Sequence, residues 1–497
     1  MTKRSMRAFL VLMVLTAVMA VPSFAATDKN TITVALSADL VSLDPMGHND
    51  IYSEKVSFLV FNRLFKLNTN FEAVPDLVAK YTQPSPTEWV FTIKSGVKFH
   101  DGTEMTSEDV KFSLLRSQES PNVKHVLSEV KGVDIVDKYS VKVTTKVAFA
   151  PFMFTLAHAG TSIVSKKYAT SADNWKNPVG SGPYSFVEWT SGDKAVLKKN
   201  PAYFDKAGMG QAERIVFRVI PEAASRTIAL ETGEVDVIAA LDPNDVPKVE
   251  VNKNLKVFRK ASTDIQYIGM NAEKAPFNDV RVRQAINYAI DKDAVVLVAL
   301  NGYGEAASSI IPSTIFGHMP GPYSYDVKKA KDLLKAAKYD SKQVIKLWAS
   351  GDTRKKIAEV VQSNLNDVGI KAEIEMFEWG AYLQATNSGT QGIFLLGWGS
   401  NPDPDSMLTP LFSKGSIGAQ NRSRYVNEKV EKYLADGRIE LNVAKRKQIY
   451  NDMSDVIMQD ATWVPLYTGN NIVGANAKLM GVELSPQGLW NLEKLHY

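Results

Sequence analysis

The stretch from Glu88 to Arg116 reads as a complete strand, turn and helix, and it constrains the fold more than any other part of the chain. Its opening residues, EWVFTIK, alternate large apolar side chains with other residues, which is typical of a strand with one buried face. Ser95-Gly96 then supplies a turn. Thr106 and Asp109 have the spacing of a capping box, in which two side chains satisfy free backbone amides at a helix start. We therefore expect a half-buried strand followed by a helix that begins at Thr106.

The N-terminal residues have the parts of a secretory leader. Three basic side chains precede an apolar run from Ala8 to Val21, and Ser23-Phe24-Ala25 places small residues where signal peptidase cleaves. The apolar run is shorter than the roughly 20 residues that cross a bilayer. We expect residues 1–25 to be a cleaved signal peptide. Because the sequence contains no cysteine, a lipidated cysteine, disulfides and thiolate metal sites are excluded, and a Gram-negative periplasm fits best.

Charge and size limit the classes of function. The chain has 58 basic and 54 acidic residues, and the leader takes three basic and no acidic ones, so 55 against 54 leaves a mature net charge of +1. A nucleic-acid-binding surface would need lysine and arginine concentrated on one face, so we expect no nucleic-acid partner. Without its leader the 497-residue chain keeps 472 residues, which at about 150 residues per domain predicts two or three domains.

Strand and helix patterns alternate along the chain, which indicates a mixed α/β protein. The predicted strands are 31–37, 89–94, a hairpin over 132–146, 214–220, 235–241, 264–271, 371–377, 392–398 and 463–473. The predicted helices are 52–64, 223–231, 282–290 and 354–367, with the one that begins at Thr106. After Asn271 the helices are longer and the strands shorter, which indicates a second lobe with its own sheet.

Several motifs, in order along the chain, resemble the family 5 extracytoplasmic solute-binding proteins, the peptide, nickel and glutathione receptors of ATP-driven importers. They are GVKFHDG with DVKFSLLR, PVGSGPYSFVEW (178–189), DVRVRQAINYAIDKDAVV (279–296) and GWGSNPDPDSMLTPLF (397–412). The resemblance implies the two-lobed periplasmic binding protein fold of type II, in the large cluster with an extra subdomain in the first lobe. Lobe I would cover 26–268, with the subdomain at about 60–180, lobe II 269–468, and residues 469–497 would return to lobe I. Hinge crossings would fall at about 267–271 and 465–470.

The function that this resemblance implies is the periplasmic capture of a small peptide or peptide-like solute in the cleft between the lobes. The chain, as a monomer, would deliver its ligand to the permease subunits of an ABC transporter in the inner membrane. We expect no cofactor and no catalysis, because the common nucleophile, phosphate-loop, dinucleotide and zinc-protease motifs do not occur. A secreted hydrolase acting on peptides or glycosides, a receptor for a nickel or haem complex, and a peptide-holding chaperone stay open as alternatives.

The loop after Gly397-Trp398 faces the cleft in relatives, and Trp398 could stack on a ligand. Dipeptide receptors of the family have an aspartate for the ligand's α-ammonium where this chain has Asn401. A buried ammonium needs a counter-charge, so either Asp403 replaces that aspartate or the ligand is not an ordinary peptide. Asp405 is a further candidate, although Asp405 or Ser406 equally fits the cap of the following helix.

Basic side chains could bind a ligand carboxylate. Arg354 begins a helix where dipeptide receptors offer an arginine, and the guanidinium groups of Arg422 and Arg424 suit a carboxylate or phosphate. His48 and Asn49 belong to the cleft rim in relatives. The expected ligand-binding residues are thus Trp398, Asn401, Asp403, Asp405, Arg354, Arg422, Arg424, His48 and Asn49, with no catalytic residue and no metal ligand.

Overall fold

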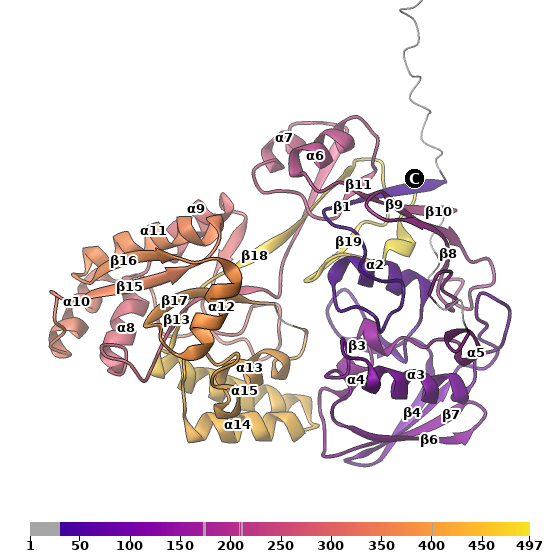
Figure 1. Ribbon diagram of the computed structural model, residues 1–497, viewed down its shortest axis with the longest axis horizontal. Coiled ribbons are helices and arrows are strands. Elements are labelled where there is room, and N and C mark those ends of the chain that lie inside the picture. The colour runs from indigo at the N-terminus through magenta and orange to yellow at the C-terminus, as the bar shows by residue number, and fades with distance from the viewer. Residues whose placement is uncertain (1–29, 172–174, 208, 210–211, 400) are drawn as a thin grey trace, which may run out of the picture.

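The computed structural model describes residues 30–171, 175–207, 209, 212–399 and 401–497, so the predicted signal peptide lies outside the described residues. The chain forms two lobes, and the long strand β18 (Trp463–Asn476) runs from one into the other (Figure 1). No helix among these residues has the length and apolar character that crossing a membrane requires.

The first lobe has a mixed sheet in the order β18-β11-β1-β10-β9-β8, with β12 also paired to β18. Its strands and helices are β1 (Thr31–Leu36), β8 (Tyr184–Thr190), β9 (Lys194–Lys199), β10 (Arg214–Val219), β11 (Val237–Ile238), β12 (Leu255–Ala261), α2 (Ile51–Val60), α6 (Ala223–Glu231) and α7 (Val246–Glu250). β1 pairs in parallel with both β10 and β11. A central parallel strand needs apolar residues on both faces, and Val34, Ala35 and Leu36 are all buried.

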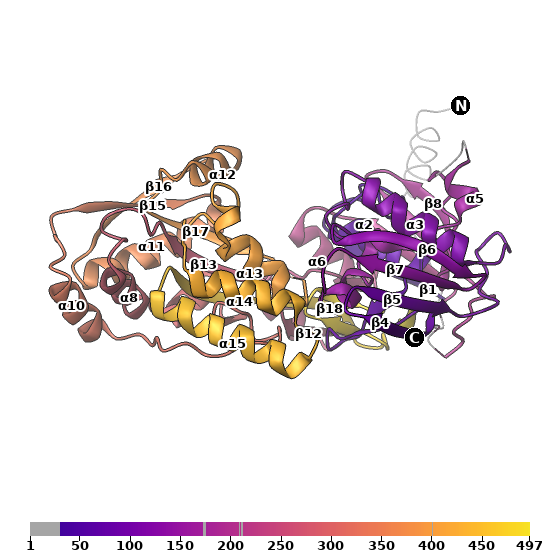
Figure 2. The ribbon, with the colours of Figure 1, turned by 90° about the horizontal axis from the view of Figure 1, so that it is seen from below.

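A separate four-stranded sheet with its own apolar core forms part of the first lobe. Its strands, which Figure 2 shows side by side, are β4 (Val78–Ser85), β5 (Glu88–Ile93), β7 (Ser140–Thr145) and β6 (Val130–Asp137), in that spatial order. The other elements of this region are β2 (Phe65–Leu67), β3 (Ala73–Pro75), α3 (Ser107–Glu119), α4 (Phe152–Thr155) and α5 (Lys166–Ala169). The capping box is confirmed, since Asp109 Oδ2 accepts from the Thr106 amide at 3.0 Å.

The second lobe places helices on both faces of the sheet β16-β15-β17-β13-β18. Its elements are β13 (Ile265–Met270), β14 (Gly304–Ala306), β15 (Val344–Ala349), β16 (Lys371–Met376), β17 (Ile393–Trp398), α8 (Val280–Ala289), α9 (Lys292–Leu300), α10 (Val327–Ala336), α11 (Asp352–Asp367), α12 (Trp379–Ser388), α13 (Asp405–Phe412), α14 (Glu428–Ile439) and α15 (Val443–Asp460). Along β13, Ile268 and Met270 enter the core with α8 and α11, whereas Ile265 and Tyr267 enter the core with α13 and α15. This alternation explains why the strand carries apolar side chains on both faces.

The chain crosses between the lobes beside β18. β12 pairs with the 470–476 part of β18, and β13 pairs with its 463–467 part, so the crossings are 262–264 and 468–469. The first crossing lies a few residues before the stretch that the sequence suggested, because both faces of β13 are already buried in the second lobe. The short strands β19 (Glu483–Ser485) and β20 (Gly488–Trp490) of the tail follow in the first lobe.

Two of the predicted elements are shorter than expected. Only Val237–Ile238 of the predicted strand 235–241 pairs, because β11 adjoins β1 for two residues before the chain turns away. The predicted helix 52–64 ends at Val60, since Phe61 is extended and Gly182 donates its amide to the Val60 carbonyl at 2.9 Å. Residues 61–64 therefore leave the helix, with Phe61 and Leu64 in apolar cores of the first lobe and Asn62 and Arg63 facing a cavity between the lobes.

Candidate functional site

Two adjoining cavities of about 310 and 380 Å³ lie between the lobes, and we name them the first and second chambers. Both are lined by Glu54, Phe58, Leu67, Gly399, Asn401, Gln487 and Trp490. The shared wall thus combines helix α2 and the C-terminal tail with the loop that follows β17. Clefts of this size at a domain junction are the usual position of small-molecule sites.

The apolar wall of the first chamber is built by α2 and the tail. Glu54 and Phe58 lie one turn apart on the same face of α2. The ring of Trp490 meets Phe58 edge to face, with centroids 5.3 Å apart, and its indole nitrogen donates to the Leu67 carbonyl at 3.2 Å. These contacts fix the orientation of both rings.

Arg63 projects a nearly buried cation into this chamber. Its residue is 5% exposed, and its guanidinium carbon lies 4.2 Å above the Phe58 ring. The nitrogens Nε and Nη1 are buried and have no hydrogen-bond partner in the part of the chain that the structure describes. Asp76 does not fill this role, because its carboxylate accepts from the Asn62 side chain and from the Arg63 backbone amide.

Burial dominates the electrostatics of the first chamber. It raises the pKa of Glu54 to about 7 and lowers the pKa of Lys55 to about 8. Burial also raises the pKa of Glu493. Asp264 borders the cavity from the first hinge crossing, and its side chain is exposed to the solvent of the cleft. The protein around it nevertheless raises its pKa by desolvation, and among the described residues no charged or hydrogen-bonding partner offsets this effect.

The second chamber has a more aromatic lining. His125 and His158 lie with ring centroids 6.5 Å apart, and burial lowers the pKa of His158 to about 4, so this ring is neutral at physiological pH. Trp398 lines this chamber, and its indole nitrogen is buried with no hydrogen-bond partner among the residues that the structure describes. A ligand acceptor here could therefore bind Trp398.

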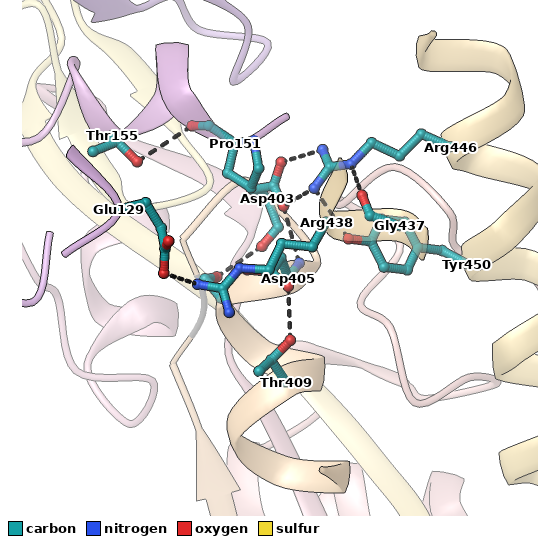
Figure 3. A network of polar contacts seen from close by, with 11 residues as sticks. Glu129, Pro151, Thr155, Asp403, Asp405, Thr409, Gly437, Arg438, Arg446 and Tyr450 are labelled. Carbon is teal, nitrogen blue, oxygen red and sulfur yellow. Dashed lines mark hydrogen bonds and ion pairs between the residues drawn. The ribbon is translucent and has the colours of Figure 1, made fainter. Parts of the chain in front are cut away.

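The loop after β17 is held by a buried ion pair (Figure 3). Asp403 is 2% exposed and accepts both terminal nitrogens of Arg446, one of them at 2.7 Å. Arg446 also donates to the Gly437 carbonyl and to the Tyr450 hydroxyl. Asp403 is thus neutralised by Arg446 and offers no free charge to a ligand ammonium.

Asp403, rather than Asp405 or Ser406, accepts from the first backbone amide of α13, that of Asp405, at 2.9 Å. The Asp405 carboxylate instead accepts from the Thr409 hydroxyl at 2.7 Å, and desolvation raises its pKa. The expectation that Asp405 or Ser406 caps this helix is therefore corrected. The proline-containing turn shifts the capping position to Asp403, two residues before the helix begins.

Contacts join the lobes at the second chamber. Arg438 Nη2 of α14 lies 3.3 Å from Glu129 Oε1 in the first lobe, and the Arg438 carbonyl accepts from the Ala150 amide at 2.9 Å. The Arg438 guanidinium also lies 3.8 Å from the Asp405 carboxylate (Figure 3). It lies above the Phe149 ring as well. The loop that borders the cavities is therefore adjacent to an interlobe ion pair.

Replacing Glu129 with glutamine should loosen this contact without unfolding the protein. Partly exposed ion pairs contribute about 0–1 kcal/mol, so we expect a change in the free energy of unfolding below about 1 kcal/mol. The distribution of interlobe distances in single-molecule fluorescence should nevertheless broaden, because the ion pair with Arg438 is lost.

Glu250→Gln is the matched control, because it breaks a surface pair with Arg259 that lies within the first lobe. It should leave the distance distribution unchanged. Equal distributions for Glu129→Gln and the control would contradict the interlobe role of Glu129.

The other predicted residues lie outside the linings of the two chambers. Arg354 Nη2 donates to Gln266 Oε1 at 3.4 Å, Arg422 to the Thr386 hydroxyl at 3.1 Å, and Arg424 to Glu273 at 2.6 Å. His48 is buried against the Ser57 hydroxyl, which corrects its expected place at the rim. Asn49 is exposed. Trp398, Asn401, Asp403 and Asp405 do line a chamber.

Sequence reasoning missed Glu54, Arg63, Asp264 and Trp490. The predicted helix 52–64 includes both Glu54 and Arg63, whereas in the structure Glu54 lies in the first turn of α2 and Arg63 lies beyond its last residue. The predicted strand 264–271 includes Asp264 as its first residue, and Trp490 falls in the tail, for which the sequence predicts no role in binding. A signal was present in Asp264, the charged residue beside an otherwise apolar strand.

Comparisons with known proteins cover nearly the whole chain. Residues 72–419 match the family model described as bacterial extracellular solute-binding proteins, family 5 Middle. The glutathione-binding protein GsiB of Escherichia coli (strain K12) is 30% identical over 497 residues, with 96% of each chain covered. The structure of HbpA2 from Haemophilus parasuis has a TM-score of 0.86 at 27% identity, covering 94% of this chain and 99% of that one. The periplasmic binding protein DppA from Helicobacter pylori, in complex with the peptide STSA, has a TM-score of 0.76 at 29% identity, with 94% and 98% covered.

Proposed function

Because the chain belongs to family 5 of the bacterial extracellular solute-binding proteins, we propose that it captures a small peptide or peptide-like solute for an ABC importer. The motif resemblance and the two-lobed α/β fold that it implied are confirmed. GsiB is named for glutathione, and DppA was solved with a tetrapeptide, so glutathione and short peptides are the first candidate ligands.

The observation that carries this proposal is the charged cavity between the lobes. Its walls combine apolar rings with a cation at Arg63 and carboxylates at Glu54 and Asp264. A small solute with separated positive and negative groups can satisfy both signs of charge in this enclosed space. Binding across the lobe junction would stabilise the arrangement in which both lobes contact the solute.

The location and the partners follow from the same proposal. Members of the family are extracellular by description. For this chain we place the mature protein in a Gram-negative periplasm after cleavage behind Ala25. There it would act as a monomer and pass its ligand unchanged to the permease subunits in the inner membrane, without catalysis. The lobes would rotate about the crossings at 262–264 and 468–469.

Isothermal titration calorimetry tests this function. The mature chain, stripped of bound ligand by unfolding and refolding, is titrated with glutathione and with alanine peptides of two to four residues. We expect saturable one-to-one binding of at least one compound, an increase in the melting temperature, and recovery of that compound unchanged. Release of a hydrolysed product would instead support a secreted hydrolase. Failure of the whole panel to bind would overturn the proposed ligand class.

A further inference from the structure

The geometry of the first chamber assigns a direction to its ligand. We propose that Arg63 in the first lobe binds the ligand's carboxylate and that Asp264 at the hinge binds its ammonium group. The ligand class is thus a dipolar α-amino acid derivative, such as a short peptide with both termini free. This inference rests on the proposed function and adds two specificity-determining residues to it.

Arg63 is built as a carboxylate receptor. Its residue is 95% buried, yet Nε and Nη1 have no hydrogen-bond partner among the described residues. Phe58 covers one face of the guanidinium at 4.2 Å, which restrains the plane and leaves the nitrogens at its edge. A carboxylate accepts two parallel hydrogen bonds from such an edge. A buried guanidinium without hydrogen-bond partners carries an uncompensated desolvation penalty. A ligand carboxylate that accepts its hydrogen bonds offsets this penalty and therefore binds favourably.

The preceding loop keeps Arg63 available to a ligand. Asn62 donates to both oxygens of Asp76, and the Arg63 backbone amide donates to the same carboxylate at 3.0 Å. The Asp76 carboxylate is therefore held by amides. Its position anchors the backbone of Arg63 without pairing the guanidinium.

Asp264 supplies the opposite pole. It lines the same 310 Å³ cavity as Arg63, and its carboxylate points into the space that Gly399 leaves open. A Cβ atom at position 399 would lie 3.0 Å from Asp264 Oδ1, so the glycine permits this close approach. Asn401, on the same loop as Gly399, lines the cavity beside it. Asp264 thus provides the counter-charge that the neutral Asn401 does not.

The alternative charged residues are committed to other contacts. Asp403 is paired with Arg446, and Arg354 and Arg422 donate to Gln266 and Thr386 outside the chamber linings. The lining of the first chamber also includes Glu54, Lys55, Lys66, Asp76 and Glu493. Arg63 is distinguished by its guanidinium nitrogens, which are buried and unpaired among the described residues, and Asp264 by its exposed carboxylate at the hinge crossing. Closure of the lobes would bring both to one ligand, which couples recognition to closure.

Terminal modification of the ligand tests the two poles separately. Each peptide of the calorimetry panel that binds the wild-type chain is titrated again as its C-terminal amide and as its N-acetyl form. We expect each modification to weaken binding by about 100-fold or more, as the loss of one partner of a buried charge pair does. In Arg63→Gln, the free acid and the amide should bind within about 10-fold of each other. In Asp264→Asn, the peptide with a free N-terminal amine and its N-acetyl form should bind within about 10-fold of each other.

Controls separate a local effect from misfolding. Lys194→Gln removes a partly exposed cation of the first lobe that pairs with Glu188 outside both chamber linings, and it should leave affinity within about threefold. Arg63→Lys keeps the charge without the two-nitrogen edge and should weaken binding to an intermediate extent. Wild-type protein that binds acid and amide equally, or an Arg63→Gln variant that still discriminates between them 100-fold, would overturn the inference while peptide binding itself stands. If no peptide binds the wild type, the proposed function fails and this inference fails with it.

Discussion

Replacing Asp403 with alanine should lower the free energy of unfolding by about 3–5 kcal/mol, because it leaves the Arg446 guanidinium buried without its counter-charge. Arg446 is 4% exposed. Burial alone would lower the pKa of Arg446, and the Asp403 carboxylate raises it above its usual value. The same carboxylate accepts from the first amide of α13, so the substitution also removes a helix cap. Urea unfolding followed by tryptophan fluorescence measures the change.

The double substitution of Asp403→Ala with Arg446→Met is the control for this prediction. It removes the orphaned charge as well as the carboxylate, and apolar replacements of buried ion pairs are often close to neutral. We therefore expect the double variant to be more stable than Asp403→Ala alone. Additive losses in the double variant would show that the two side chains act independently, in conflict with the structure.

Gly180→Ala should destabilise the protein by about 3 kcal/mol and weaken ligand binding with it, although the residue lies outside the linings of both chambers. A Cβ atom at this position would lie 1.9 Å from the Val60 carbonyl oxygen and 2.7 Å from its carbon. Both are backbone atoms at the end of α2, so the helix must move. Glu54 and Phe58 lie on that helix and Arg63 follows it, so the cavity wall moves too.

Gly132→Ala is a matched comparison, because no atom of the described residues outside its chain neighbours lies within 4 Å of the added Cβ there. On strand β6 this change should be neutral or slightly stabilising, since glycine loses more backbone freedom on folding than alanine does. Thermal unfolding and calorimetry of the two variants provide the test. A Gly180→Ala protein with wild-type stability and affinity would mean that the motif around Gly180 does not position α2.

The parts of the fold that depend on local patterns could be predicted from the sequence. The capping box of Thr106 and Asp109, the strand 214–220 and the helix 223–231 need only their own residues, and the structure has all three. The end of α2 could not be predicted in this way, because Gly182 and Asp76, far along the chain, determine where it stops.

The site was harder to predict for the same reason. Asp403 has the charge and the sequence position of a ligand-binding residue. Its partner Arg446 is 43 positions away, and no local pattern in the sequence indicates that the two side chains pair. For Arg63 the sequence misleads in the opposite direction. It resembles an ordinary helical arginine, but in the folded protein it is buried and packs against Phe58. In both cases the availability of a charge depends on tertiary partners rather than on residue type.

The two lobes should close on a dipolar solute, and the distance between a label in each lobe measures this closure directly. Because the chain contains no cysteine, Val136→Cys in the first lobe and Val443→Cys in the second would provide two unique sites for spin labels, both at exposed positions. Pulsed electron paramagnetic resonance should show a shorter distance between the two labels when a binding peptide is added. The C-terminal amide of that peptide, at the same concentration, should leave the distance unchanged. An identical distance with and without a peptide that calorimetry shows to be bound would contradict the account.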